Sequence, residues 1–213
     1  MDVGLDTSHL IAIAAALGWA SGLRLYAVLF LVGLAGQLGW VPLPPGLALW
    51  SQPLVLGATG LMLVVEFFAD KIPGVDSLWD TVHTVIRVPA GAALAASVLG
   101  GDDATWTLIA ALMGGTLAAT SHVAKATTRA AVNTSPEPFS NLGLSLFGDA
   151  LVPAMLYLAW EMPGWFFAAL AVAVVAGWVV TFVLFRFLRG LVRSAGDRIS
   201  GEALGVSRPR KSR

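Results

Sequence analysis

The sequence predicts an all-α membrane protein, a polytopic transmembrane helix bundle of about six spans, because it has little charge and long apolar segments. Of its 213 residues, 57% are hydrophobic and only 12% are charged, and the mean hydropathy is +0.78. Soluble domains carry about 25% charged residues, so this chain cannot build an ordinary aqueous surface. We therefore expect the lipid bilayer to surround most of the protein.

Six segments are long and apolar enough to cross a bilayer, which takes about 20 helical residues. Pro- and Gly-containing turns separate them, such as Pro42-Leu43-Pro44-Pro45-Gly46 after the first and Ile72-Pro73-Gly74 after the second. Backbone groups in lipid must be hydrogen-bonded within the segment, so each segment is predicted to be helical. The expected spans are 8–38, 53–70, 77–99, 104–132, 143–161 and 164–189.

The first segment is too long for one upright span. Its 31 residues would make a helix of about 46 Å. Ser21-Gly22, just before Arg24, offers a place to break. A tilted helix, a kinked helix and a re-entrant pair all stay open, and a re-entrant pair would move the N-terminus outside.

Segments one and four share a general character that raises the question of an internal repeat. Both are long, rich in Ala and Gly, contain an Arg (Arg24 and Arg129), and are followed by two further spans. Three spans per half would give two inverted three-helix halves, an arrangement common in transporters.

The distribution of basic residues predicts the orientation. Eight of the thirteen Lys and Arg residues lie at or after Arg186, so the C-terminus is expected in the cytoplasm. Six crossings would then place both termini there, with a single transmembrane domain at 1–190 and a basic cytoplasmic tail at 191–213. Five tryptophans fall at the opposite interface in this topology, as indoles prefer: Trp40, Trp50, Trp106, Trp160 and Trp165.

Two features of the composition exclude classes of function. The formal net charge of zero argues against nucleic acid as a partner. The absence of cysteine excludes disulfides, thiolate metal sites and a cysteine nucleophile.

Ionisable residues follow helical spacing near one end of the predicted spans. Asp76, Asp80, His83 and Arg87 fall at i, i+4, i+7 and i+11, which is one helix face. The second segment adds a carboxylate pair, and the first and fifth segments add one charge each. The remaining members of this set are Arg24, Glu66, Asp70, His122, Lys125, Arg129, Asn133 and Asp149.

Charge at membrane depth costs about 2.5–3.5 kcal/mol per residue, so such groups usually face a partner or a watery cavity. We expect these faces to form a shared, cytoplasm-facing polar vestibule. Its substrate-binding residues would be Arg24, Arg87, His122, Lys125, Arg129 and Asn133. Of these, Arg87, His122, Lys125 and Arg129 would form a positive wall opposite Glu66, Asp70 and Asp80. The acidic members and His83 would form a coupling or polar network. Snorkelling to the headgroups and structural ion pairing are the alternatives for these charges.

A metal site in this cluster stays open, and no cofactor is predicted. Glu66, Asp70, Asp80 and His83 are suitable ligands for a divalent ion. No metalloenzyme signature accompanies them. Catalytic residues are therefore not assigned.

Three stretches of the sequence resemble a known family. They are Ser21 to Tyr26 (SGLRLY), Glu66 to Gly91 (EFFADKIPGVDSLWDTVHTVIRVPAG) and His122 to Asn141 (HVAKATTRAAVNTSPEPFSN). Together they resemble the bacterial integral membrane family known as domain of unknown function 4126. The family pattern places Pro directly after Arg87, whereas Val88 precedes Pro89 here. The resemblance implies a multi-pass protein of the prokaryotic plasma (inner) membrane and supplies no activity.

Three functions compete at this point. The leading hypothesis is a small transporter or channel-like protein for an anionic solute or headgroup, with proton or cation coupling at the acidic residues. An enzyme that acts on a lipid or isoprenoid phosphate with a divalent ion is the first alternative, and a non-catalytic membrane scaffold is the second. A homo-oligomer stays open in each case.

Overall fold

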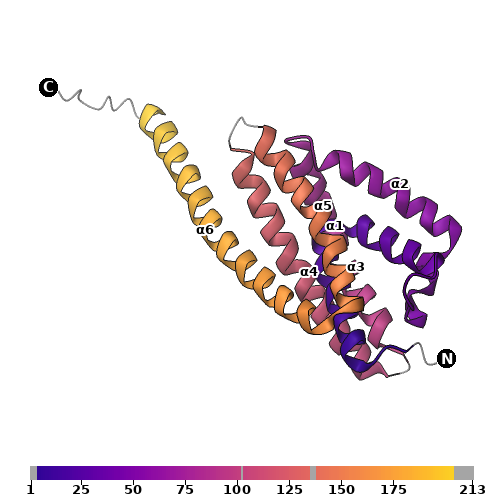
Figure 1. The fold of residues 1–213 in the computed structure, drawn as a ribbon. Coiled ribbons are helices and arrows are strands. Elements are labelled where there is room, and N and C mark those ends of the chain that lie inside the picture. The colour runs from indigo at the N-terminus through magenta and orange to yellow at the C-terminus, as the bar shows by residue number, and fades with distance from the viewer. Residues whose placement is uncertain (1–3, 102, 135–137, 204–213) are drawn as a thin grey trace.

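The computed structural model describes residues 4–101, 103–134 and 138–203, and these residues form helices joined by turns, without a strand (Figure 1). The prediction of an all-α bundle is confirmed. The elements are α1 (Thr7–Gln37), the short 3₁₀ helix η1 (Pro45–Ser51), α2 (Pro53–Ala69), α3 (Val75–Leu99), α4 (Ala104–Val132), α5 (Pro138–Glu161) and α6 (Pro163–Ala203).

Five of the described helices are long and apolar enough to cross a membrane. A sixth span results if η1 and α2, which meet at an angle of 72°, count as one. Large apolar side chains on α6 are exposed, among them Val172 (70%) and Trp178 (64%). Such a surface requires lipid as its solvent, so the chain is a multi-pass membrane protein.

The last helix is longer than expected. The expected span ended at residue 189, but α6 continues to Ala203, so the first part of the predicted tail (191–203) is helical. Residues 204–213 of that tail lie outside the described part of the chain.

Asp6 starts α1 as its N-cap. Its Oδ1 accepts hydrogen bonds from the Ser8 hydroxyl (2.7 Å) and from the backbone N–H of His9 (2.9 Å). The hydrogen bond from Ser8 contributes most, and together these bonds hold the pKa of the exposed Asp6 carboxyl well below its usual range.

The first helix breaks at Arg24, whose φ of −147° and ψ of 86° are not helical. The first arm of α1 (7–23) packs along α4, with Gly18 against Gly114 and Gly22 against Ala118. The residue numbers of the contacting pairs increase together along both helices, so this arm runs parallel to α4. Inverted halves would make segments one and four antiparallel, so that predicted arrangement is wrong for this arm.

After its break α1 runs beside α2, with Phe30 against Gly60 and Gly33 against Leu56 (Figure 1). The segment that follows α1 lies near the end of the bundle where α3 and α5 end. The Trp160 indole, at the end of α5, donates to the Pro42 carbonyl (3.1 Å), and Gly46 of η1 packs against Ser97 near the end of α3. The first segment is therefore a bent, re-entrant pair of arms. As a result, α1 begins at one end of the bundle and α6 ends at the other, whereas the expected even number of crossings placed both termini on one side.

Small residues set the distance between the three central helices. A Cβ on Gly18 would lie 2.5 Å from the Cα of Gly114, and a Cβ on Gly91 would lie 2.7 Å from the Cβ of Ala118. Close backbone approach through Gly and Ala is a main source of helix association in lipid, where no hydrophobic effect drives it. The buried face of α1, which includes Ile13, Leu17 and Val28, fills the core between these helices.

We predict that the start of α1 and the end of α6 face opposite sides of the membrane. The chain has no cysteine, so single cysteines at Ser8, Thr105 and Gly190 can be labelled with an impermeant maleimide in intact and opened cells. Ser8→Cys should label like Thr105→Cys at the start of α4, and opposite to Gly190→Cys. Labelling of Ser8→Cys together with Gly190→Cys would contradict the re-entrant first segment.

We also predict that Gly18→Ala lowers stability, because its methyl group would overlap the α4 backbone. Overpacking of this kind costs about 1–3 kcal/mol. Gly57→Ala is the matched control, since nothing lies within 4 Å of its added Cβ. Thermal unfolding in detergent should separate the two variants, and equal melting temperatures would contradict the close contact.

Candidate functional site

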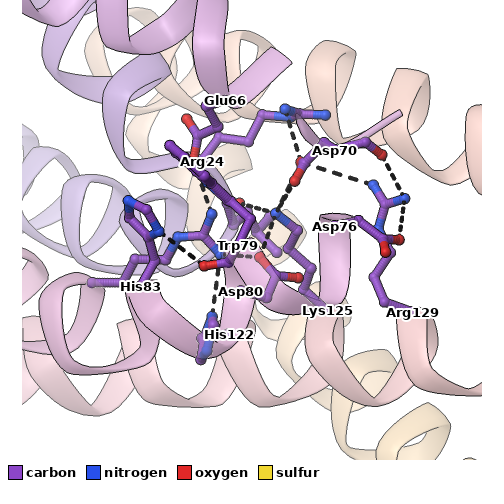
Figure 2. A network of polar contacts seen from close by, with 12 residues as sticks. Arg24, Glu66, Asp70, Asp76, Trp79, Asp80, His83, His122, Lys125 and Arg129 are labelled. Atoms are coloured by element: carbon purple, nitrogen blue, oxygen red, sulfur yellow. Dashed lines mark hydrogen bonds and ion pairs between the residues drawn. The ribbon is translucent and has the colours of Figure 1, made fainter. Parts of the chain in front are cut away.

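Asp70, the C-cap residue of α2, lies at the centre of a buried ion-pair network (Figure 2). Its Oδ2 is 2.9 Å from Arg24 Nη1, 2.9 Å from Lys125 Nζ and 3.8 Å from Arg129 Nη2. The Asp70 side chain is fully buried. One carboxylate therefore connects the end of α2 to the break in α1 and to two turns of α4.

Arg87 of α3 joins two further carboxylates to this centre. Its Nη2 lies 2.9 Å from Glu66 Oε1 and its Nη1 lies 2.6 Å from Asp80 Oδ1. Asp80 also reaches Lys125 Nζ at 3.0 Å, which links the Arg87 group to Asp70. His122 Nδ1 is 3.3 Å from Arg87 Nη1, and its Nε2 is 2.8 Å from the Thr84 hydroxyl.

Arg24 holds the network to α5. Its Nε is 2.9 Å from Asp149 Oδ1, and its Nη2 donates to the carbonyl (3.0 Å) and hydroxyl (2.9 Å) of Ser145. Lys71 takes the other oxygen of the Asp149 carboxylate, with its Nζ 2.9 Å from Oδ2. Gly148 packs beside Arg24, where an added Cβ would be 3.6 Å from Nε.

Arg129 ties α4 to the start of α3 and to α5. Its Nη1 donates to the Asp70 carbonyl (2.8 Å) and to Asp76 Oδ2 (3.3 Å), and it contacts the side-chain oxygen of Asn141. The Asn133 amide, one turn further, donates to Asp76 Oδ1 at 2.9 Å. Both ends of the Asp76 carboxylate are therefore held by α4.

His83 lies at the edge of the network. Its ring stacks on Trp79 with centroids 4.0 Å apart, and its Nδ1 is 2.9 Å from the Trp79 carbonyl. Its Nε2 is 3.4 Å from the hydroxyl of Tyr26. The sequence prediction that Asp80, His83 and Arg87 point into the bundle is confirmed, since all three are at most 5% exposed.

The break in α1 depends on two network side chains. In an unbroken helix the Leu23 carbonyl and the Tyr26 N–H would bond within α1. Instead, the Leu23 carbonyl accepts from Lys125 Nζ (3.0 Å), and the Tyr26 N–H donates to Glu66 Oε2 (3.2 Å). An unpaired backbone group in an apolar interior is costly, so these bonds stabilise the break.

The network is electrically balanced over the described residues. Its cations are Arg24, Lys71, Arg87, Lys125 and Arg129, and its carboxylates are Glu66, Asp70, Asp76, Asp80 and Asp149, so five charges of each sign are present. Each cation lies within ion-pair distance of at least one carboxylate, so positive and negative groups alternate through the network. The expected positive wall opposite an acidic wall is therefore wrong.

All twelve residues singled out from the sequence lie in or against this network, although their roles stay predictions. Reasoning from helix faces missed the parts played by Tyr26, Asn141 and Ser145. Tyr26 and Asn141 lie in the stretches that carry the family resemblance, whereas nothing in the sequence pointed to Ser145. No group of three or more metal-ligating side chains of the kinds considered (His, Cys, Asp, Glu) occurs in the described part of the chain.

A groove of about 970 Å³ adjoins the network between α1, α4, α5 and α6. Its walls are mostly apolar and include Leu151, Met155, Ala169 and Ala173. Figure 1 shows that α6 diverges from α4 and α5 toward its C-terminal end. Four charged network residues also line it: Arg24, Asp70, Lys125 and Arg129.

We predict that Arg87→Met lowers the free energy of unfolding by about 3–5 kcal/mol, because it leaves a buried carboxylate without its partner. Glu66 has no other Arg or Lys within ion-pair distance in the described structure, whereas Asp80 keeps Lys125. Adding Glu66→Gln should therefore recover more stability than adding Asp80→Asn. Thermal unfolding of both double variants measures this, and equal recovery would contradict the pairing.

The family profile described as Domain of unknown function (DUF4126) matches residues 11–183. Searches of curated proteins and of solved structures gave no match. The profile covers most of the chain, so the protein belongs to this family, as the sequence resemblance predicted.

Proposed function

We propose that this member of the DUF4126 family is a membrane transport protein that binds an anionic amphiphile. The apolar chain of the ligand would occupy the groove, and its anionic group would meet Arg24, Lys125 and Arg129. The observation that supports this best is the composition of the groove wall. Of the network's charges it includes three cations and one carboxylate, a local excess of two positive charges beside apolar walls.

Arginine suits this role because its planar guanidinium binds phosphate or carboxylate oxygens in pairs. The network as a whole is neutral, so the anion is attracted only where the cations outnumber the carboxylates. An apolar wall favours a lipid headgroup over a small free anion, because only the lipid has a chain for the groove. We therefore take a membrane lipid as the expected source of the anion.

The break in α1 favours transport over simple binding. Transporters commonly place substrate and ion sites at interrupted helices, where freed backbone groups face polar side chains. Leu23 and Tyr26 provide this arrangement beside Lys125 and Glu66. The network end of the bundle is proposed to face the cytoplasm of a prokaryotic cell, because Arg186 and Arg189 follow on α6 at that end.

A structural scaffold is the second candidate, because every network cation is within ion-pair distance of a carboxylate. The enzyme alternative needs carboxylates that are free to hold a divalent ion. Glu66, Asp70 and Asp80 each lie within 2.9 Å of an Arg or Lys nitrogen. We therefore do not propose an enzyme.

The proposal predicts that dodecyl methyl phosphate, which has one fixed negative charge, stabilises the protein in neutral detergent. A ligand at 100 times its Kd should add about 2.7 kcal/mol to the free energy of unfolding. Two controls separate the sources of affinity: dimethyl dodecyl phosphate has the chain without the charge, and dimethyl phosphate has the charge without the chain. Both should shift the melting temperature much less.

A groove-filling variant tests the location. Ala173→Trp places an indole in the groove and should abolish the shift, whereas Val179→Trp, at a 57% exposed position of the same helix outside the groove lining, should keep it. Movement of a fluorescent anionic lipid between the leaflets of reconstituted vesicles then tests transport. No binding of the charged probe, or equal binding by Ala173→Trp, would contradict the proposal.

A further inference from the structure

Asp149 differs from the other network carboxylates in its exposure. Its side chain is 21% exposed, whereas those of Glu66, Asp70 and Asp76 are fully buried and that of Asp80 is 3% exposed. It lies one turn after Ser145 on α5, at the edge of the network. Asp149 is therefore the least enclosed of the five network carboxylates.

The charged groups that face Asp149 come from two elements. Arg24 at the break in α1 holds Oδ1, and Lys71 in the turn after α2 holds Oδ2, both at 2.9 Å. Within the described residues, no other Arg, Lys or His lies within ion-pair distance of this carboxylate. Asp149 is linked to Asp70 through Arg24, because Arg24 Nη1 pairs with Asp70 while Arg24 Nε pairs with Asp149.

Arg24 belongs to both the ion pair and the groove. It lines the groove beside Gly148, and Asp149 occupies its Nε. An anion that enters the groove and binds Arg24 competes with Asp149 for the same guanidinium. Asp70, in contrast, shares three cations and is the hardest carboxylate to displace.

Binding of an anion changes the net charge of the network. The network has five positive and five negative charges, so one bound monovalent anion leaves a net charge of −1. An uncompensated charge is costly at membrane depth. One proton on Asp149 restores neutrality, since five cations then face four carboxylates and one anion.

We infer that anion binding is coupled to protonation of Asp149: the anion replaces this carboxylate on Arg24, and Asp149 takes up one proton from solution. This inference rests on the proposed function and adds that anion binding is coupled to proton uptake. Each monovalent anion binds with one proton, and both leave together. The transported species is then electrically neutral, so the membrane potential does not oppose its movement.

Calorimetric titration with dodecyl methyl phosphate tests this, in two buffers of the same pH and different ionisation enthalpy. The difference in heat between the buffers gives the number of protons taken up per probe bound. Wild type should take up about one proton. Because binding takes up protons, affinity should fall by up to about tenfold per unit rise in pH.

Asp149→Asn should bind the probe without proton uptake and without this pH dependence. Because this variant leaves Arg24 and Lys71 with one carboxylate fewer, Asp149→Asn combined with Lys71→Met restores four charges of each sign and guards against misfolding. Glu161→Gln, an exposed carboxyl at the end of the same helix, is the matched control and should keep one proton per probe.

The outcomes are distinct. No binding by wild type overturns the proposed function together with this inference. Binding by wild type without proton uptake overturns the coupling alone. Proton uptake that persists in Asp149→Asn, whose network is neutral with the anion bound and no proton added, assigns the proton to another group and overturns the role of Asp149. The Asp149→Asn, Lys71→Met variant has a net charge of −1 with the anion bound, so it should bind the probe more weakly than Asp149→Asn, and equal binding would contradict the charge balance.

Discussion

The Asp70 carboxylate binds Arg24, Lys125 and Arg129, and through them it holds α1, α2 and α4 in register. Each of these cations is at most 10% exposed, so the carboxylates around it are its main partners. Removing one member of such a group exposes the others to an uncompensated charge. The position of the α2 end and the charged wall of the groove both depend on this one side chain.

The break in α1 and the network require one another. A broken helix at membrane depth leaves a carbonyl and an N–H without partners, and Lys125 and Glu66 supply them. In turn, the break places Arg24 where it can reach both α2 and α5. Close packing of Gly18 and Gly22 on α4 fixes the height of this arm, so the small residues determine where the break lies.

The sequence predicted the helices, and it singled out residues that the structure places together in one buried polar network, because both follow from periodicity. Apolar length and Pro-Gly turns located the spans, and the i, i+4, i+7 and i+11 spacing placed Asp76, Asp80, His83 and Arg87 on one buried face. The pairing of charges was not predictable, because it depends on the rotation of each helix about its axis and on the position of each residue along the bundle. The conformation at Arg24 was also left open, because Ser21-Gly22 allows a bend without fixing its direction. The side of the membrane on which α1 begins depends on that direction.

The ion pairs join residues that are far apart in the sequence, and this separation constrains how the protein is made. Arg24 emerges from the ribosome long before Ser145, which follows 121 residues later, and before Asp149. Until the end of α2 has been synthesised, Arg24 has none of its final partners, and a charge without a partner costs about 2.5–3.5 kcal/mol in lipid. The network therefore forms completely only after α5 has been synthesised, because α5 supplies Ser145 and Asp149 to Arg24. A chain that ends before α5 lacks both partners and leaves Lys71 without its carboxylate as well.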